Sequence, residues 1–311
     1  MLVRSRNTDP DGYTTCRNGD WKILRSHDPD IGRPARPRGE DIRLWRDGDI
    51  AGTEMLRALR TAHRYPAHSH DEFVIATFEA GAQHHTVASR PGLAVSGSVM
   101  VISPGEVHTG EPAAQAGMWS YRAFYPKTEV LEEIAEDLFG GQGIHLDFGR
   151  RPLWQDREAA NHLSRMHARI EGARDPLEKQ DALLSAFAPL IRRYGQSSTG
   201  TARRQPPAGN VGRAIDLIHA CFEQRLTTAD IARSVGLSDF HFMRSFKEKT
   251  GMTVHAYLTQ VRLQAAKDRL AAGLSPAETA TSVGFFDQSH FTNHFRTSFG
   301  VTPRRFAASC C

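Results

Sequence analysis

The sequence predicts an α+β protein of two domains. A small β-barrel accompanied by helices comes first, and an all-α domain with two helix-turn-helix units follows. Three observations indicate this: an internal repeat in the C-terminal third, β-branched runs bounded by turn residues in the N-terminal half, and helical periodicity between them. The 311 residues, 40% of them hydrophobic, are sufficient for two domains with separate cores.

Residues 1–40 are rich in Arg, Asp, Gly and Pro and show no hydrophobic periodicity, so we expect a disordered arm there. Short strands are predicted between residues 41 and 126. Glycine and proline turns separate these strands, and many short strands at regular spacing are typical of a small barrel. The predicted strands include Phe73–Phe78, His85–Ala88, Ser98–Ile102 and Trp119–Tyr125.

Between residues 127 and 195 the pattern becomes helical. Apolar residues recur at helical spacing in three stripes, which begin at Val130, Leu163 and Leu183. We expect most of these helices to pack on the barrel. Residues 196–209 are rich in Ser, Gly, Arg and Pro, so a flexible linker is predicted there, and residues 307–311 are predicted to form a tail.

The C-terminal third repeats itself. In each copy a small alanine is followed by a turn glycine, which favours the left-handed conformation, and by two phenylalanines on one helical face. Ser275 and Glu278 predict a capping box, and Ser238 and Asp287 stand where second helices begin. The two copies therefore predict two helix-turn-helix units. The matched pairs are Ala232/Ala280, Val235/Val283, Gly236/Gly284, Phe242/Phe291, Phe246/Phe295, Gly251/Gly300 and Thr253/Thr302.

Residues from about 208 to 306 resemble the DNA-binding domain of the AraC/XylS family of transcription regulators. The resemblance rests on Val283–Phe291, on Phe295 and Arg296, and on Phe299–Pro303. It implies seven helices, of which two recognition helices enter successive major-groove segments of double-stranded DNA. From Val211 onward twelve Lys and Arg residues outnumber eight Asp and Glu residues, which suits a polyanionic partner.

We expect ten outward residues of the two recognition helices to contact DNA. Arg244 can bond guanine edges, and Gln288 and Asn293 can bond adenine. Lys247 and Arg296 are better placed for phosphates. For each residue the alternative is a solvated helix face. The predicted set is Asp239, Phe240, Met243, Arg244 and Lys247 in the first helix, and Gln288, Ser289, Thr292, Asn293 and Arg296 in the second.

The segments Pro66–Phe73 and Pro104–Pro112 resemble the cupin-type sensor domain of AraC-family proteins. The resemblance assigns residues 41–195 to effector binding and dimerisation, and residues 210–306 to DNA binding. A barrel that binds a small molecule should mix apolar walls with a few polar groups. Arg122 could clamp a carboxylate, or it could be a solvated strand residue. The predicted effector-binding residues are His68, His70, Glu72, His108, Tyr121 and Arg122.

Metal binding is the alternative for the histidines. On a strand His68 and His70 point to one face, and with His108 they could form a three-imidazole site with an open position. Enzymatic cupins usually add a glutamate, but Val74 and Ile75 occupy that region. The sequence therefore favours a polar pocket lining, without a metal, a cofactor or catalytic residues. Backbone-bonded strand-end histidines stay open as a third interpretation.

We expect a non-enzymatic transcription regulator that is controlled by a small-molecule effector. The family resemblance implies an activator, a homodimer and contact with RNA polymerase. No apolar leader and no long apolar run occurs, so a cytoplasmic protein without membrane contact is predicted. Two alternatives stay open: a metal-binding cupin enzyme or metallo-sensor fused to a DNA-binding module, and a barrel that only dimerises.

Overall fold

The computed structural model describes residues 39–113, 117–199 and 209–310. All of these residues belong to one compact unit, Arg36–Cys311. Nearly all of the predicted arm, most of the predicted linker and Cys311 lie outside the described residues. The predicted domain boundaries therefore stay a prediction. No helix among the described residues is both long enough and apolar enough to cross a membrane.

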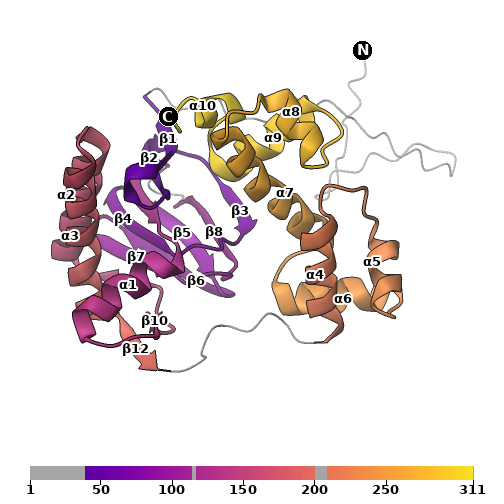
Figure 1. Cartoon of the computed structure of the whole chain (residues 1–311), viewed down its shortest axis with the longest axis horizontal. Coiled ribbons are helices and arrows are strands. Elements are labelled where there is room, and N and C mark those ends of the chain that lie inside the picture. Colours follow the sequence, from indigo (N-terminus) through magenta and orange to yellow (C-terminus); the bar gives the residue numbers. More distant parts are fainter. Residues whose placement is uncertain (1–38, 114–116, 200–208, 311) are drawn as a thin grey trace, which may run out of the picture. The chain divides into compact units, whose positions relative to one another are not determined.

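The first half of the chain forms two antiparallel sheets that face each other (Figure 1). The larger has the strand order β1-β2-β9-β4-β7-β11, and the smaller has the order β3-β8-β5-β6. The strands are β1 Asp41–Asp47, β2 Thr53–Thr61, β3 Tyr65–His68, β4 Val74–Ala80, β5 Ala82–Val87, β6 Arg90–Val95, β7 Ser98–Ile102, β8 His108–Pro112, β9 Trp119–Tyr125 and β11 Leu153–Gln155.

The predicted fold class is confirmed, with one difference in the barrel. Within the described ranges no strand pairing joins the larger sheet to the smaller one, so the sheets do not form a closed barrel. Apolar residues of both sheets, such as Ala76 and Phe78 of β4 and Val87 of β5, share one core cluster. Facing sheets and a closed barrel bury the same alternating residues, so the sequence pattern does not distinguish them.

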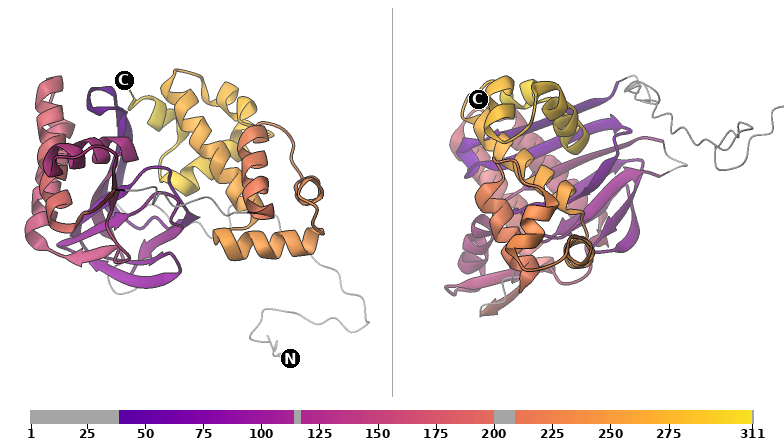
Figure 2. Two further views of the ribbon diagram at one scale, coloured as in Figure 1. Left: turned by 60° about the horizontal axis from the view of Figure 1, so that its bottom comes forward. Right: turned by 90° about the vertical axis from the view of Figure 1, so that its right-hand side faces the viewer.

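Three helices follow, and two of them cover the outer face of the larger sheet (Figure 2). They are α1 Thr128–Phe139, α2 Arg157–Gly172 and α3 Pro176–Tyr194. Leu163 of α2 and Phe187 of α3 pack against Ile75 and Phe124 of the sheet, as predicted. A short strand, β12 (Gln196–Thr199), lies in the predicted linker and pairs with β10 (Ile144–Asp147).

The C-terminal part is all helical, as predicted, and contains the two repeated units. Gly236 and Gly284 end the first helix of each unit with φ values of 72° and 84°. At Gly284 a Cβ atom would lie 2.7 Å from the carbonyl oxygen of Glu223, so this turn has room only for glycine. The helices are α4 Asn210–Cys221, α5 Thr228–Ser234, α6 Asp239–Thr250, α7 Val254–Ala271, α8 Pro276–Ser282, α9 Gln288–Phe299 and α10 Pro303–Ala307.

Helix caps in this part agree with the sequence. Ser275 and Glu278 form the predicted capping box of α8, and the Asp287 side chain accepts a hydrogen bond from the His290 amide at the start of α9. Ser238 stands at the predicted N-cap position of α6, where its side chain makes no capping hydrogen bond. The caps fix where each second helix begins, and hence which side chains it exposes.

Candidate functional site

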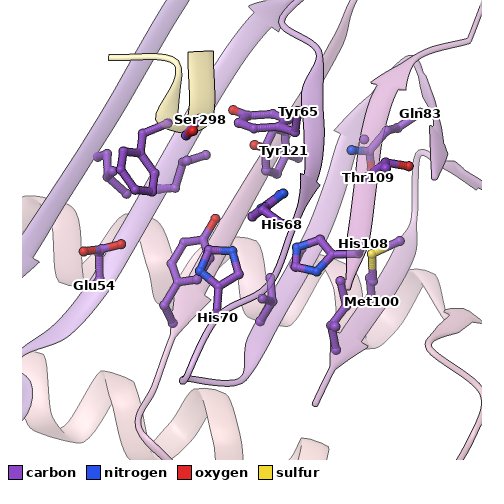
Figure 3. Close-up of a pocket in the computed structure, with 18 of the residues that line it drawn as sticks. Glu54, Tyr65, His68, His70, Gln83, Met100, His108, Thr109, Tyr121 and Ser298 are labelled. Carbon is purple, nitrogen blue, oxygen red and sulfur yellow. The ribbon is translucent and has the colours of Figure 1, made fainter. Parts of the chain in front are cut away.

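A cavity lies between the two sheets and offers about 610 Å³ of space, part of it open to solvent (Figure 3). Its walls are mainly aliphatic and aromatic, and polar side chains are few. Apolar walls with a few polar groups are typical of small-molecule sites. The lining includes Leu44, Glu54, Leu56, Tyr65, His68, His70, Val74, Ala76, Phe78, Met100, His108, Tyr121, Tyr125, Ser298 and Phe299.

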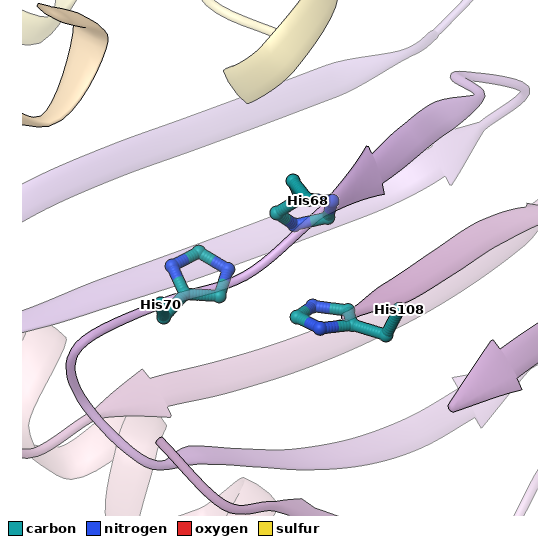
Figure 4. Close-up of side chains that lie close together, drawn as sticks. All are labelled: His68, His70 and His108. Atoms are coloured by element: carbon teal, nitrogen blue, oxygen red, sulfur yellow. The ribbon is translucent and has the colours of Figure 1, made fainter. Parts of the chain in front are cut away.

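Three histidines converge in this cavity (Figure 4). His68 ends β3, His70 follows in the next loop, and His108 begins β8. The rings of His68 and His108 have centroids 4.2 Å apart, and the ring of His70 lies 4.9 Å from His68 and 5.3 Å from His108. The structure therefore brings together the three histidines that the sequence singled out.

Burial disfavours the charged form of all three imidazoles. Burial lowers the pKa of His68 to about 4, against an opposing hydrogen bond to the carbonyl of Pro66. Burial also lowers the pKa values of His70 and His108 well below the ordinary value, and the neighbouring histidine rings lower them further. Neutral imidazoles keep a lone pair that can accept a hydrogen bond or bind a metal.

The side chains predicted to contact DNA lie on the outer sides of α6 and α9. Asp239, Phe240, Met243, Arg244 and Lys247 of α6 are all exposed. In α9 the side chains of Gln288, Ser289 and Asn293 are exposed, whereas Thr292 and Arg296 are half-buried. The paired phenylalanines Phe242/Phe246 and Phe291/Phe295 are fully buried beneath these surfaces, as predicted. Each unit thus presents a largely exposed helix face supported by an aromatic core.

Comparison with known proteins identifies the family to which the chain belongs. Residues 51–187 match the family model of the AraC-like ligand binding domain, and residues 231–309 match the model of a helix-turn-helix domain. The two matches together cover more than half of the chain and follow the order that the sequence predicted. The chain belongs to the AraC family of transcription regulators.

Two sequence relatives agree with this assignment. The HTH-type transcriptional regulator YbfI of Bacillus subtilis is 25% identical over 76% of this chain and 85% of its own length. The HTH-type transcriptional activator RhaS of Pectobacterium carotovorum is 24% identical over 86% of this chain and 95% of its own. A crystal structure of ToxT from Vibrio cholerae aligns with 12% identity and a TM-score of 0.48, over 83% of this chain and 97% of that one.

Two predicted effector residues of this AraC-family regulator, Arg122 and Glu72, lie outside the cavity lining. Tyr121 and Arg122 are neighbours on β9, so their side chains point to opposite faces of the sheet. Tyr121 lines the cavity, whereas Arg122 forms ion pairs with Glu79 at 2.7 Å and Glu171 at 3.0 Å. Glu72 is also absent from the lining, and burial raises the pKa of its carboxyl group. In this structure Arg122 therefore binds carboxylates of the chain itself, on the face of β9 opposite the cavity.

Other lining residues were missed from the sequence. Alternation along β9 places Tyr125 on the same face as Tyr121, so this residue could have been found from the strand pattern. Glu54 of β2 and Phe299 of α9 had no such signal, because they reach the cavity only through the packing of distant segments. These two residues connect the cavity to the C-terminal helices.

A buried ion pair forms the most direct connection. The Lys267 Nζ atom of α7 lies 2.7 Å from the Glu54 Oε1 atom, and both side chains are almost completely buried. Lys267 also lies over the ring of Phe299, 5.0 Å from its centroid. Glu54 and Phe299 both line the cavity, so the cavity wall includes a residue of α9 and a residue that is paired with α7.

Proposed function

We propose that this AraC-family regulator is controlled by a small molecule that binds in the cavity between the sheets. The observation that supports this most strongly is Glu54, a cavity-lining residue whose Oε2 atom is buried. Among the described residues this atom has no hydrogen-bond partner, and its ion-pair partner, the Arg46 Nη2 atom, is 3.7 Å away. Leaving a buried acceptor without a hydrogen bond costs about 1–3 kcal/mol or more. A ligand with a hydrogen-bond donor would remove this cost, so we infer an effector that combines an apolar face with at least one donor.

The route from effector to DNA runs through the same residue. A ligand that bonds Glu54 competes with or reinforces its ion pair with Lys267 of α7. The helix α7 joins the two helix-turn-helix units, so a change at Lys267 alters how the recognition helices are presented. If the recognition helices have two arrangements, a ligand shifts the balance between these arrangements only by binding one more tightly than the other. Ligand contacts with Glu54 and Phe299 can supply this difference in affinity.

We propose that α6 and α9 bind double-stranded DNA through the ten outward residues predicted above. The exposure of eight of them and their position on second helices support this, as does the AraC family assignment. We also propose that the protein is an activator, as the similar RhaS of Pectobacterium carotovorum is, and that it contacts RNA polymerase. Exposed Leu177 and Leu184, seven residues apart on α3, favour a homodimer. A non-enzymatic role in the cytoplasm completes the proposal.

The first test separates base recognition from general attraction to DNA. We expect Arg244→Ala to weaken binding to a selected operator by roughly ten- to a hundredfold and to relax the preference at one base pair. Fluorescence anisotropy on operators obtained by in vitro selection measures both. In the free protein Arg244 pairs with Glu248 at 2.9 Å, and this exposed pair must open for DNA.

Arg233→Ala is the matched control. Arg233 is also exposed and also pairs with a carboxylate on its own helix, at 3.2 Å from Asp230 of α5, but it is outside the recognition helices. We expect its loss to affect selected and random DNA alike. An Arg244→Ala variant that lost equal affinity for both kinds of DNA would contradict base recognition by Arg244.

The second test addresses the effector. We expect a metabolite screen by thermal shift to yield a ligand whose effect disappears in Ala76→Phe, since Ala76 lines the cavity and a phenyl ring would fill it. Ala80→Phe, at the exposed end of the same strand, should keep the response. A ligand that shifts both variants equally would place the effector elsewhere. If no metabolite shifts the wild-type protein, a domain that only dimerises becomes the better interpretation.

A further inference from the structure

We propose that His68, His70 and His108 bind one divalent transition-metal ion, with a coordination position open to the cavity. The sequence favoured a metal-free polar lining, because the glutamate of enzymatic cupins is missing. The geometry of the folded chain favours a bound metal. The proposed ion is a resident of the sensor cavity and needs no catalytic glutamate.

The first argument is convergence. One nitrogen of each histidine can be chosen so that all three lie within 4.8 Å of one another. A tetrahedral zinc ion with Zn–N bonds near 2.1 Å holds its nitrogens about 3.4 Å apart. The rings therefore need to move together by roughly 1 Å, which rotation about side-chain bonds provides. Figure 4 shows the three rings grouped around a common space.

The second argument is the orientation of two rings. The Nδ1 atom of His68 is 2.7 Å from the carbonyl oxygen of Pro66, and the Nδ1 atom of His108 is 2.9 Å from that of Glu106. A carbonyl only accepts, so each Nδ1 atom carries the proton and each Nε2 atom keeps its lone pair. Metal-binding histidines are commonly held in this way, with the second nitrogen donating to a backbone carbonyl.

The third argument is the remaining ring. The side chain of His70 is only 6% exposed, and its buried Nδ1 atom has no hydrogen-bond partner among the residues that the structure describes. Backbone-bonded strand-end histidines would explain His68 and His108, but they leave this buried nitrogen unexplained. A metal ion satisfies it. Three imidazole ligands suit zinc, copper, nickel, cobalt or iron, and do not suit magnesium or calcium, which prefer oxygen ligands.

The experiment uses the full-length, untagged protein after chelation and dialysis, with Co²⁺ as the spectroscopic probe and Zn²⁺ as the competitor. We expect one equivalent of Co²⁺ per chain, visible bands of a four- or five-coordinate ion, and displacement by Zn²⁺. His108→Asn should weaken binding at least about tenfold, since it removes one of three ligands. Unfolding curves recorded with chelator establish whether the variant is folded.

His290→Asn is the matched control. The Nε2 atoms of His290 and His294 on α9 lie 2.9 Å apart, so this pair is a competing site for the probe. We expect His290→Asn to leave the stoichiometry unchanged. Loss of binding in this variant and not in His108→Asn would overturn the proposal, as would the absence of stoichiometric binding to the wild-type protein.

If His108→Asn does not fold, X-ray absorption of the wild-type cobalt or zinc form decides the question. We expect about three imidazole ligands, and a site with sulfur ligands or with fewer than two imidazoles would refute the assignment. The result is independent of the proposed function, because metal content is measured without DNA or effector. A metal ion can bind to the histidines even if the Ala76→Phe experiment finds no effector in the cavity. An effector can also bind in the cavity if the histidines bind no metal.

Discussion

Replacing Lys267 with methionine is expected to lower the free energy of unfolding by about 3–5 kcal/mol. The substitution keeps most of the side-chain volume but leaves Glu54 charged and buried, 4% exposed, without its partner at 2.7 Å. The Arg46 Nη2 atom, 3.7 Å from the Glu54 Oε2 atom, offsets part of this loss. Urea unfolding of the full-length protein, followed by circular dichroism, measures the change.

Two further variants identify the cause. Lys267→Met combined with Glu54→Leu removes both charges, so most of the stability should return, since a hydrophobic pair can replace a buried ion pair. Asp268→Ala, at the next residue, breaks an exposed pair with Arg46 and should cost less than about 1 kcal/mol. Equal losses in Lys267→Met and Asp268→Ala would show that burial of the pair has no energetic consequence.

Phe291→Ala is expected to cost about 3–5 kcal/mol of stability, because it empties a fully buried site in the second helix-turn-helix unit. The ring of Phe291 lies between those of Phe285 and Phe295, with centroids 5.3 Å and 5.6 Å away. The same unfolding experiment measures the loss. DNA binding should weaken as well, because α9 loses the packing that holds its outward residues in place.

Phe286→Ala is the control for this prediction. Phe286 lies five residues before Phe291 and is 96% exposed, so truncating its side chain should change stability by less than about 0.5 kcal/mol. The two variants remove the same atoms and differ only in burial. An unchanged melting temperature in Phe291→Ala would contradict the assignment of this residue to the core.

The helix-turn-helix units illustrate what local patterns can predict. Gly236 and Gly284, the capping box at Ser275 and the buried phenylalanine pairs all follow from short-range rules, and the structure confirms each of them. Such rules depend on backbone conformation and helical periodicity within about ten residues. These rules therefore hold in any tertiary arrangement that buries the same helix face.

The cavity illustrates the opposite case. Tyr121 and Arg122 were predicted together, although strand alternation sends them to opposite faces. Choosing between them required knowing which face of β9 meets the smaller sheet and which meets α2. Arg122 lies on the α2 face, where it pairs with Glu171, and Tyr121 lies in the cavity. The partners of Arg122 lie more than forty residues away in the sequence, so a local sequence pattern could not show which face of β9 this side chain occupies.

By itself the sequence determined the two-part architecture, the repeated helix-turn-helix units, their aromatic core and the three histidines that could act together. Local spacing and side-chain chemistry are sufficient for these features. Only the tertiary structure decided that the sheets stay unclosed, that Glu54 and Phe299 enter the cavity wall, and that Lys267 joins the cavity to α7. The pair of Glu54 and Lys267 joins residues more than two hundred positions apart, which only the packing of the whole chain brings together.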